Sequence, residues 1–306
     1  MSFDGLLSDK TAYCESVMEK WLPTVDGLAG TDRYAAVVVD AMQYSVLAGG
    51  KRLRPLFLHE TCSMYGGRKE LAEPLMAALE MIHNYSLVHD DMPAMDNDEY
   101  RRGRKTTWVV YGEGMAVLAG DALLNFAYET ALKAFDLCEN AQETANVVSA
   151  VKLLARNAGI YGMVGGQCAD LEAEKNPAGT QEEGLWYIHK HKTACMIESG
   201  FVIGAMLAGA PEEDLNKLDR IAENIGIAFQ IQDDILDVTG DSKELGKLTG
   251  SDEKDGKVTY VTMHGLEKAA ADVRRLSEEA LQLYDSLSAS NDFLRELTVR
   301  MITRTK

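Results

Sequence analysis

The sequence has little proline, and runs of alternating β-branched residues are almost absent from it. Only six prolines interrupt the 306 residues, and helix formers such as alanine, leucine, methionine, glutamate and lysine dominate. One brief exception is the run Ala35–Val39. Strands depend on period-two patterns of β-branched and aromatic residues, so their scarcity argues against a protein built on sheets. The composition therefore predicts an all-α fold.

Cysteine is also scarce, and no signal for export or membrane insertion is visible. The five cysteines are odd in number and widely spaced without a Cys-x-x-Cys pair, which argues against disulfide frameworks and zinc sites. The start Met1–Gly5 lacks a basic segment followed by an apolar one, and no apolar run approaches the length of a membrane span. We expect a soluble, cytoplasmic protein without stable membrane insertion.

Positive charge is in deficit, with 31 lysines and arginines against 48 aspartates and glutamates and a net charge of −17. A nucleic-acid partner requires a basic footprint, so this balance argues against one. Local basic clusters nevertheless occur at Lys51–Arg54, Arg101–Lys105 and His189–Lys192. On an acidic protein such clusters are typical of pockets for small anions, and a solvated basic surface is the alternative.

Two aspartate clusters, far apart in the chain, are embedded in apolar sequence. The first occupies His89–Asp98, with Arg101 and Arg102 close behind it, and the second lies within Gln230–Asp237. Grouped carboxylates in apolar surroundings are unfavourable unless cations neutralise them. Hard divalent metals take oxygen ligands and bridge to substrate phosphates, while arginines fork phosphate oxygens. The clusters therefore predict a metal-dependent diphosphate site.

Helical periodicity carries an apolar stripe into each cluster. The first helix is expected from Pro74, with the proline in its first turn, and its stripe passes through Leu79, His83, Ser86 and Asp90. The stripe of the second helix passes through Leu218, Ala222, Ile225, Phe229, Asp233 and Asp237. Because residues at this spacing share a face, the two helices are expected to line opposite walls of one cavity.

The first cluster requires a distortion of its helix. Asp90 and Asp96 are six residues apart, which is about 240° around an ideal helix, so they cannot share a face. Pro93 removes a backbone donor and should end or distort the helix, and this distortion has to bring Asp96 back toward Asp90. Asp98 and Glu99 are expected to be solvated.

The remaining patterns predict further helices in one domain. Amphipathic stretches cover Asp121–Leu137, Thr144–Glu174 with a break at Gly165-Gly166, Glu182–Ala208 and residues 264–301. Residues 241–256 are polar and punctuated by glycine, which predicts a loop. The sequence contains neither a recognisable linker nor an internal repeat, so a single domain over residues 1–306 is expected.

Several basic and polar residues are candidates for binding anions. Gly49–Pro55 places three cations directly after two glycines, which suits the capture of an anion, and an ordinary turn is the alternative. His83 lies two turns before Asp90 on the same face, which favours contact with an anion over a place in the core. Further candidates are Lys192-Thr193, which can also cap a helix, and Gln167 with Asp170.

Together these motifs resemble the trans-isoprenyl diphosphate synthases, the head-to-tail prenyltransferases. The similarity is greatest to the bacterial farnesyl diphosphate synthase branch, which is shared with plant-type geranylgeranyl diphosphate synthases. The resemblance implies an isoprenoid synthase fold, one large helical bundle around a central cavity, in a homodimer. The matching segments are Gly49–Pro55, Met81–Gly103, Gly120–Leu123, Gly162–Leu171, Lys192-Thr193, Phe229–Asp237, Gly246-Lys247 and Asp255–Lys257.

The resemblance also implies a role for each matching residue. Three Mg²⁺ ions are implied, with Asp90, Asp96 and Asp233 as ligands and with Asp91, Asp234 and Asp237 in support. Isopentenyl diphosphate is expected to bind to Lys51, Arg54, His83 and Arg102. The allylic diphosphate is expected to bind to Arg101, Lys192, Thr193, Gln230, Lys247 and Lys257.

The implied reaction is ionisation of the allylic diphosphate and attack of the isopentenyl double bond on the resulting cation. Product length is expected to depend on Tyr85, five residues before Asp90, where plant-type geranylgeranyl diphosphate synthases carry methionine. A phenol ring there predicts a fifteen-carbon product, (2E,6E)-farnesyl diphosphate. Helical geometry turns Tyr85 about 140° from the Asp90 face, so Ser86, which lies nearer to that face, is a second candidate.

Three alternatives remain open at this point. A geranylgeranyl diphosphate synthase differs only in the floor of the cavity. A class I terpene cyclase shares a metal-bound aspartate cluster on a helical fold but requires no basic site such as Lys51, Arg54 and His83. A non-catalytic synthase subunit loses its aspartates, whereas this chain retains both sets.

Overall fold

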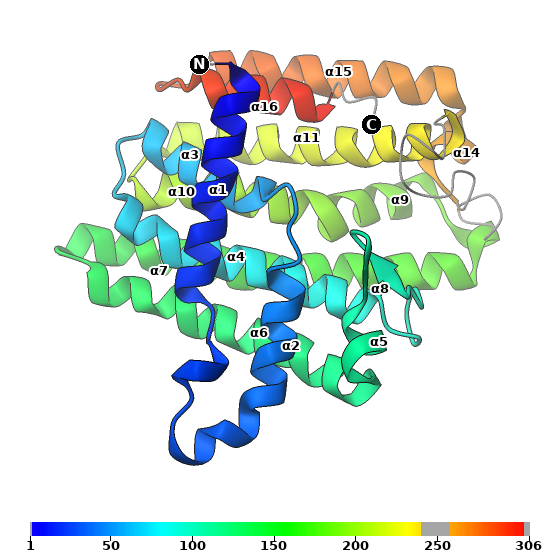
Figure 1. Cartoon of the computed structure of the whole chain (residues 1–306). Coiled ribbons are helices and arrows are strands. Elements are labelled where there is room, and N and C mark those ends of the chain that lie inside the picture. The colour runs from blue at the N-terminus through cyan, green and yellow to red at the C-terminus, as the bar shows by residue number, and fades with distance from the viewer. Residues whose placement is uncertain (1, 240–257, 303–306) are drawn as a thin grey trace.

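The structure, a computed structural model, describes residues 2–239 and 258–302, which are almost entirely helical (Figure 1). The predicted all-α class is confirmed. The longer helices are α1 (Phe3–Trp21), α2 (Ala36–Val46), α3 (Leu53–Met64), α4 (Lys69–Asp90), α6 (Glu113–Leu132), α7 (Ala141–Ala158), α8 (Met163–Lys175), α10 (Cys195–Leu207), α11 (Glu212–Thr239), α15 (Leu266–Asp285) and α16 (Asp292–Ile302). The shorter ones are α5 (Thr107–Tyr111), α9 (Glu182–Ile188) and α14 (Tyr260–His264).

Two irregular elements interrupt the helices near the predicted motifs. Strands β1 (Tyr100–Arg101) and β2 (Arg104–Lys105) form a small antiparallel hairpin after α4. A π-helical segment, His189–Ala194, joins α9 to α10. The π conformation is rare and is found mostly as single turns, frequently at functional sites.

Helix α4 lies at the centre of the bundle (Figure 1). All its residues from Leu71 to Ile82 are buried, as expected of a helix that neighbours surround on every side. Helices α1, α3, α6 and α10 pack against it, and α11 packs against α10 on one side and α15 on the other. Of the predicted apolar stripes, Leu79, Leu218, Ala222 and Ile225 are 0% exposed, whereas Phe229 is only half-buried against the core.

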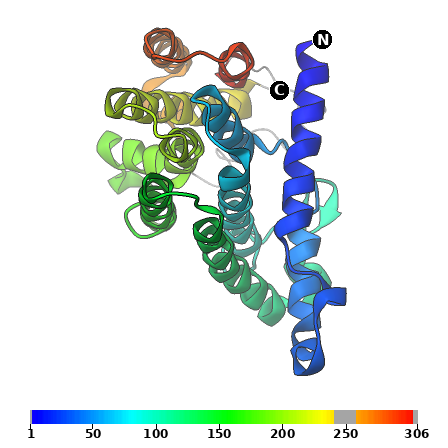
Figure 2. The same ribbon diagram turned by 90° about the vertical axis from the view of Figure 1, so that its left-hand side faces the viewer.

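Helix α1 runs along one side of the bundle (Figure 2) and is attached to it by ionic contacts. Lys10 pairs with Glu60 of α3 at 2.6 Å. On α4, Glu73 accepts a hydrogen bond from the Tyr13 hydroxyl at 2.9 Å and pairs with Lys20. Both glutamates are buried, and a buried carboxylate is tolerated only with such partners.

Several predicted boundaries are wrong in detail. Helix α4 begins at Lys69, ahead of Pro74, and the predicted helix from Asp121 begins at Glu113 as α6. The break in the 144–174 stretch lies at Gly159–Gly162, whereas Gly165-Gly166 lies inside α8. A Cβ at Gly162 would lie 2.1 Å from the carbonyl oxygen of Asn157, so this turn requires glycine.

Other stretches are divided more finely than their patterns predict. Ala36–Val39, in the exceptional β-branched run, opens α2 because tertiary packing overrides the strand preference of valine. Residues 264–301 divide among α14, α15 and α16, with a break at Gly265. The loop predicted for residues 241–256 lies outside the described residues, and the single domain remains a prediction. None of the described helices is long and apolar enough to cross a membrane.

Candidate active site

A cavity of about 460 Å³ lies between the carboxyl-terminal part of α4, helix α8 and the π segment. Most of its wall is apolar, with Met95, Met163 and Leu171 among the lining residues. Charged and polar groups enter it from separate elements. The predicted site residues that line it are Arg54, His83, Tyr85, Ser86, Asp90, Gln167, Lys192 and Thr193. The fold thus joins residues from distant motifs around one space.

The first aspartate cluster folds back on the end of α4. The helix ends at Asp90, and Pro93 lies in the turn that follows instead of within the helix. The amide of Asp96 donates to the carbonyl oxygen of Asp90 at 2.8 Å, and Asn97 takes a positive φ of 56°. The turn therefore brings Asp96 back to Asp90, as their separation of six residues required. Asp98 is exposed, as predicted.

Burial makes the first two carboxylates reluctant to ionise. It raises the pKa of Asp90 to about 6, an effect that the charge of Lys192 opposes. It also raises the pKa of Asp91 to about 6, although Arg101 donates to Asp91 at 2.7 Å. Both residues lie at the negative end of the α4 dipole, which further disfavours anions. The positive charge near these two carboxylates is therefore too small to offset the effect of burial on their pKa values.

The chemistry of this pair fits a divalent cation. Carboxylate oxygens are the ligands that Mg²⁺ prefers, and Mg²⁺ commonly binds through one or two carboxylates together with substrate phosphates. Within the described ranges, no three acidic, histidine or cysteine side chains converge tightly enough to hold a metal by themselves. The residues present therefore suit an ion that binds together with an anionic ligand.

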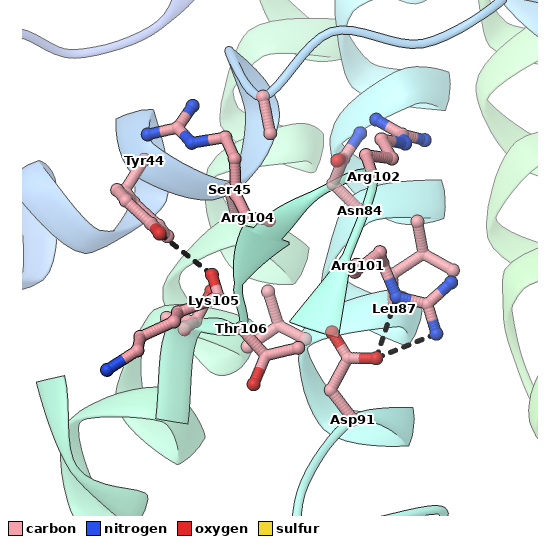
Figure 3. A pocket seen from close by; sticks show the side chains of 13 residues that line it. Tyr44, Ser45, Asn84, Leu87, Asp91, Arg101, Arg102, Arg104, Lys105 and Thr106 are labelled. Atoms are coloured by element: carbon pink, nitrogen blue, oxygen red, sulfur yellow. Dashed lines mark hydrogen bonds and ion pairs between the residues drawn. The ribbon is translucent and has the colours of Figure 1, made fainter. Parts of the chain in front are cut away.

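The β1–β2 hairpin presents two neighbouring arginines in different directions (Figure 3). Arg101 points to Asp91 and pairs with it. Arg102 has a positive φ of 54°, and its guanidinium donates to the carbonyl oxygen of Gly49. The Tyr44 hydroxyl holds the hairpin by donating to the carbonyl oxygen of Lys105 at 2.7 Å. The two adjacent arginines thus contact different parts of the protein, Arg101 the end of α4 and Arg102 the segment at Gly49.

Two glycines, one on α8 and one on α11, allow the π segment to pack closely between these helices. A Cβ at Gly166 would lie 2.1 Å from the backbone nitrogen of Lys192, and one at Gly226 would lie 2.4 Å from the Cβ of Ala194. This close approach places Lys192 at the cavity wall, where it donates to Asp170 of α8 at 2.5 Å. The buried Asp170 therefore orients the lysine.

The cationic side chains of the basic segment after Gly50 lie in different surroundings. Lys51 is exposed, whereas Arg54 lines the cavity and its Nε has no hydrogen-bond partner among the described residues. Burial lowers the pKa of His83 well below its ordinary value, and the nearby arginines, Arg54 first, add to this effect. His83 is thus neutral at pH 7. Arg54 and His83 together offer hydrogen-bond donors to an anion.

The second aspartate cluster lies at the carboxyl end of α11, the same end of the bundle as that of α4 (Figure 1). Asp234 accepts a hydrogen bond from the amide of Tyr260 at 2.8 Å. Gln230 and Asp233 are half-buried, and α11 packs against the π segment. Among the described residues, the cavity lining includes none of α11, so the shared cavity remains a prediction. Lys247 and Lys257 lie outside the described residues.

Comparison with known proteins assigns this architecture. The sequence signature described as polyprenyl synthetase matches residues 35–295. The chain belongs to the polyprenyl synthetase family. A geranyltransferase from Helicobacter pylori, solved with magnesium and isoprenyl diphosphate, superposes with a TM-score of 0.80 over 99% of this chain and 97% of that one, at 31% identity. The predicted isoprenoid synthase fold is confirmed.

Curated relatives are named for a longer product. A chloroplastic geranylgeranyl pyrophosphate synthase from Capsicum annuum is 46% identical over 83% of this chain and 68% of its own length. A geranylgeranyl diphosphate synthase from Cyanophora paradoxa is 45% identical over 79% of each chain. These names support a prenyltransferase but do not support the narrower prediction of a farnesyl product.

Some parts of this polyprenyl synthetase site were not visible in the sequence. Asp170 is a candidate from the sequence, but its hydrogen bond with Lys192 joins α8 to the π segment. Residue spacing along one helix does not predict a contact between separate elements. Gly226 and the α8 lining residue Cys168 were missed. A glycine in a helix signals close packing, and Gly226 is such a glycine, but sequence does not identify the neighbour.

We predict that Asp90→Asn stabilises the ligand-free protein at pH 7.5. The native pKa of about 6 exceeds the ordinary 3.8, so the native state holds more protons between these values and wild-type stability falls as pH rises through that window. The neutral amide avoids this loss. Melting in Mg²⁺-free buffer should show an increase in Tm of roughly 2–5 °C at pH 7.5, with the gap closing near pH 4. A lower Tm for the variant at pH 7.5 would contradict the burial argument.

Proposed function

We propose that this polyprenyl synthetase is a Mg²⁺-dependent head-to-tail prenyltransferase that condenses isopentenyl diphosphate with allylic diphosphates. The main support is the half-buried carboxylate of Asp90, which lines a largely apolar cavity, together with the neighbouring buried carboxylate of Asp91. Such a site needs cations to neutralise its carboxylates and has space for a hydrocarbon tail. The Helicobacter pylori structure, solved with magnesium and isoprenyl diphosphate, supports the same ligands.

We infer that the main product is geranylgeranyl diphosphate. The sequence predicted farnesyl diphosphate, but two relatives above 40% identity are named for the twenty-carbon product. These names favour the alternative that the sequence left open. Since the Capsicum annuum relative is named as chloroplastic, the cytoplasmic localisation of this chain also remains a prediction.

Farnesyl diphosphate is the second candidate because of Tyr85. Its ring lines the cavity, packs edge-on to His89 at 5.9 Å and is 6% exposed. Ser86, which also lines the cavity, donates from its hydroxyl to the carbonyl oxygen of His83 at 2.9 Å. If Tyr85 closes the floor, the tail stops early. If the ring forms only a side wall, the tail extends past it.

The residues divide the work by charge and position. Asp90, Asp96 and Asp233 are the proposed ligands of three Mg²⁺ ions, with Asp91, Asp234 and Asp237 in support. Bound Mg²⁺ would supply positive charge to the leaving diphosphate. The proposed contacts of the allylic diphosphate are Arg101, Lys192, Thr193, Gln230, Lys247 and Lys257. The proposed contacts of isopentenyl diphosphate are Lys51, Arg54, His83 and Arg102.

Two features of the cavity assist the chemistry that this assignment requires. Its apolar wall excludes water from the allylic cation, which water would otherwise capture. Fixed cations and backbone dipoles need no rearrangement as charge develops on the leaving group. Lys192, held by Asp170, is such a fixed charge. The diphosphate itself can take the final proton, because burial and the neighbouring arginines lower the pKa of His83 and so disfavour its protonated form.

Incubation with Mg²⁺, isopentenyl diphosphate and dimethylallyl diphosphate tests the proposal. We expect chiefly twenty-carbon product, with turnover abolished by chelation of the metal. Asp90→Ala and Asp233→Ala should each lower kcat by roughly 10²–10³-fold or more, since each removes charge that supports the transition state. Chromatography of the dephosphorylated products decides chain length. Fifteen-carbon product would favour the farnesyl alternative, and the absence of any condensation would reject the function.

The divergence of Arg101 and Arg102 predicts a split in substrate affinity. Arg101→Ala should mainly weaken the allylic substrate, and Arg102→Ala should mainly weaken isopentenyl diphosphate. A charged hydrogen bond contributes about 1.5–3 kcal/mol, which is roughly ten- to a hundredfold in KM. Steady-state kinetics with each substrate varied in turn measures both constants. Equal losses for both substrates in both variants would show that the division is wrong.

We also propose a homodimer, as the family resemblance implies. Helix α6 exposes apolar side chains in support: Val117, Leu118 and Leu132 are 40%, 54% and 50% exposed. Large exposed apolar side chains on one helix favour association. Sedimentation velocity should give twice the mass of the chain, and Leu118→Glu should shift it toward the monomer. A wild-type protein that is monomeric at micromolar concentration would contradict this proposal.

A further inference from the structure

Arg52, which lies in the chain between Lys51 and Arg54, two of the cations proposed to bind isopentenyl diphosphate, is not available to any substrate. It is 2% exposed, and each of its three guanidinium nitrogens is engaged within the protein. Its Nε and Nη2 donate to the two carboxylate oxygens of Glu15 at 2.8 and 3.0 Å. Its Nη1 donates to Glu80 at 2.7 Å. Of the three cations in this segment, this one is turned inward.

The partners of Arg52 come from three helices. Glu15 lies on α1, Glu80 lies on α4, and the carbonyl oxygen of Val46 at the end of α2 also accepts from Nη2 at 2.5 Å. Glu80 has a side-chain relative exposure of 3% and Glu15 one of 31%. Removing one partner of a buried ion pair leaves an uncompensated charge, so each carboxylate constrains the arginine.

The backbone that Arg52 belongs to is in an uncommon conformation. Arg52 has φ 47°, and Gly49 and Gly50 before it have φ 82° and 144°. An arginine keeps a left-handed backbone conformation only where the surrounding structure fixes it. On the other side of this segment, Arg102 donates to Gly49, and a Cβ at Gly50 would lie 2.9 Å from the Arg102 guanidinium. The segment is thus held from two sides.

This conformation determines where the two flanking cations lie. Lys51 is directed outward and is exposed, while Arg54, in the first turn of α3, lines the cavity. Glu80 precedes His83 by one turn of α4, so one carboxylate fixes Arg52 relative to the helix that carries His83. Three of the four groups proposed to bind isopentenyl diphosphate, Lys51, Arg54 and His83, are therefore placed relative to one another through Arg52.

We propose that Glu15 and Glu80, acting through Arg52, are positioning residues for the isopentenyl diphosphate site, and that helix α1 thereby completes this site. The proposal rests on the proposed function, because it needs isopentenyl diphosphate to bind at Lys51, Arg54 and His83. It assigns α1, which contributes no residue to the cavity lining, a substrate-specific role. The allylic side, built on Lys192 and Arg101, does not depend on these contacts.

The test is a comparison of Michaelis constants in Glu15→Gln. The amide preserves the shape of Glu15 and removes its charge, and the partial exposure of this residue favours folding of the variant. Small displacements of binding groups reduce binding strongly, so KM for isopentenyl diphosphate should rise about tenfold. The KM for the allylic substrate and kcat should stay within about twofold. Calorimetric titration with isopentenyl diphosphate alone, which has no partner to react with, should show the same loss.

Two further variants separate positioning from general stability. Arg52→Lys retains a positive charge but cannot fork between two carboxylates, so it should show the same selective loss. Lys10→Gln is the matched control, because it breaks another ionic contact between α1 and the bundle, the 2.6 Å pair with Glu60. We expect it to lower Tm while leaving both Michaelis constants unchanged.

The outcomes distinguish this proposal from the function on which it rests. If wild type condenses the substrates but Glu15→Gln lowers only Tm, or raises both Michaelis constants equally, the positioning role is wrong. A selective rise in Lys10→Gln equal to that in Glu15→Gln would assign the effect to undocking of α1 and would also overturn it. If wild type forms no prenyl diphosphate, the proposed function fails first, and the positioning role fails with it.

Discussion

Two carboxylates at the carboxyl end of the central helix α4, the half-buried Asp90 and the buried Asp91, impose the constraint on which the rest of the site depends. Burial raises the pKa of Asp90 and Asp91 to about 6, and the α4 dipole adds to the penalty. Arg101 and Lys192 compensate only in part. The role that we propose for a site in this state is to bind cations and, through them, polyanions. The largely apolar cavity beside it then provides a place for a hydrocarbon tail.

Helix α4 connects the parts of the proposed mechanism in order along its length. Glu80 fixes Arg52, His83 lines the cavity as a neutral donor, Tyr85 lines its wall, and Asp90 ends the helix. Because α4 is surrounded by other helices, displacement of one of these groups is resisted by the packing of the whole core. The rigidity suits a reaction in which fixed charges stabilise a transient cation.

The sequence was sufficient for the fold class and for much of the site because periodicity reports the face of a helix directly. Leu79 and Ile225 are core residues as predicted, and the turn after Asp90 returns Asp96 to it. Contacts between distant segments were not predictable. The sequence counts Arg52 only among three cations that suit the capture of an anion, and its structural role is not visible there because its partners, Glu15 and Glu80, share no local pattern with it. Product length stays a prediction: the names of the relatives favour the twenty-carbon alternative over the one drawn from Tyr85, whose effect depends on the whole cavity.

The central claim is that metal and diphosphate bind where carboxylates are partly protonated in the free protein. Calorimetric titration with Mg²⁺ and inorganic diphosphate, repeated in buffers of different ionisation enthalpy, measures the protons released on binding. Comparison with Asp90→Asn removes the contribution of the ligand's own protons. At pH 6, wild type should release about half a proton more than the variant, since its carboxyl is half-protonated near a pKa of about 6. The difference should vanish at pH 8. Equal release by both proteins at pH 6 would contradict the account.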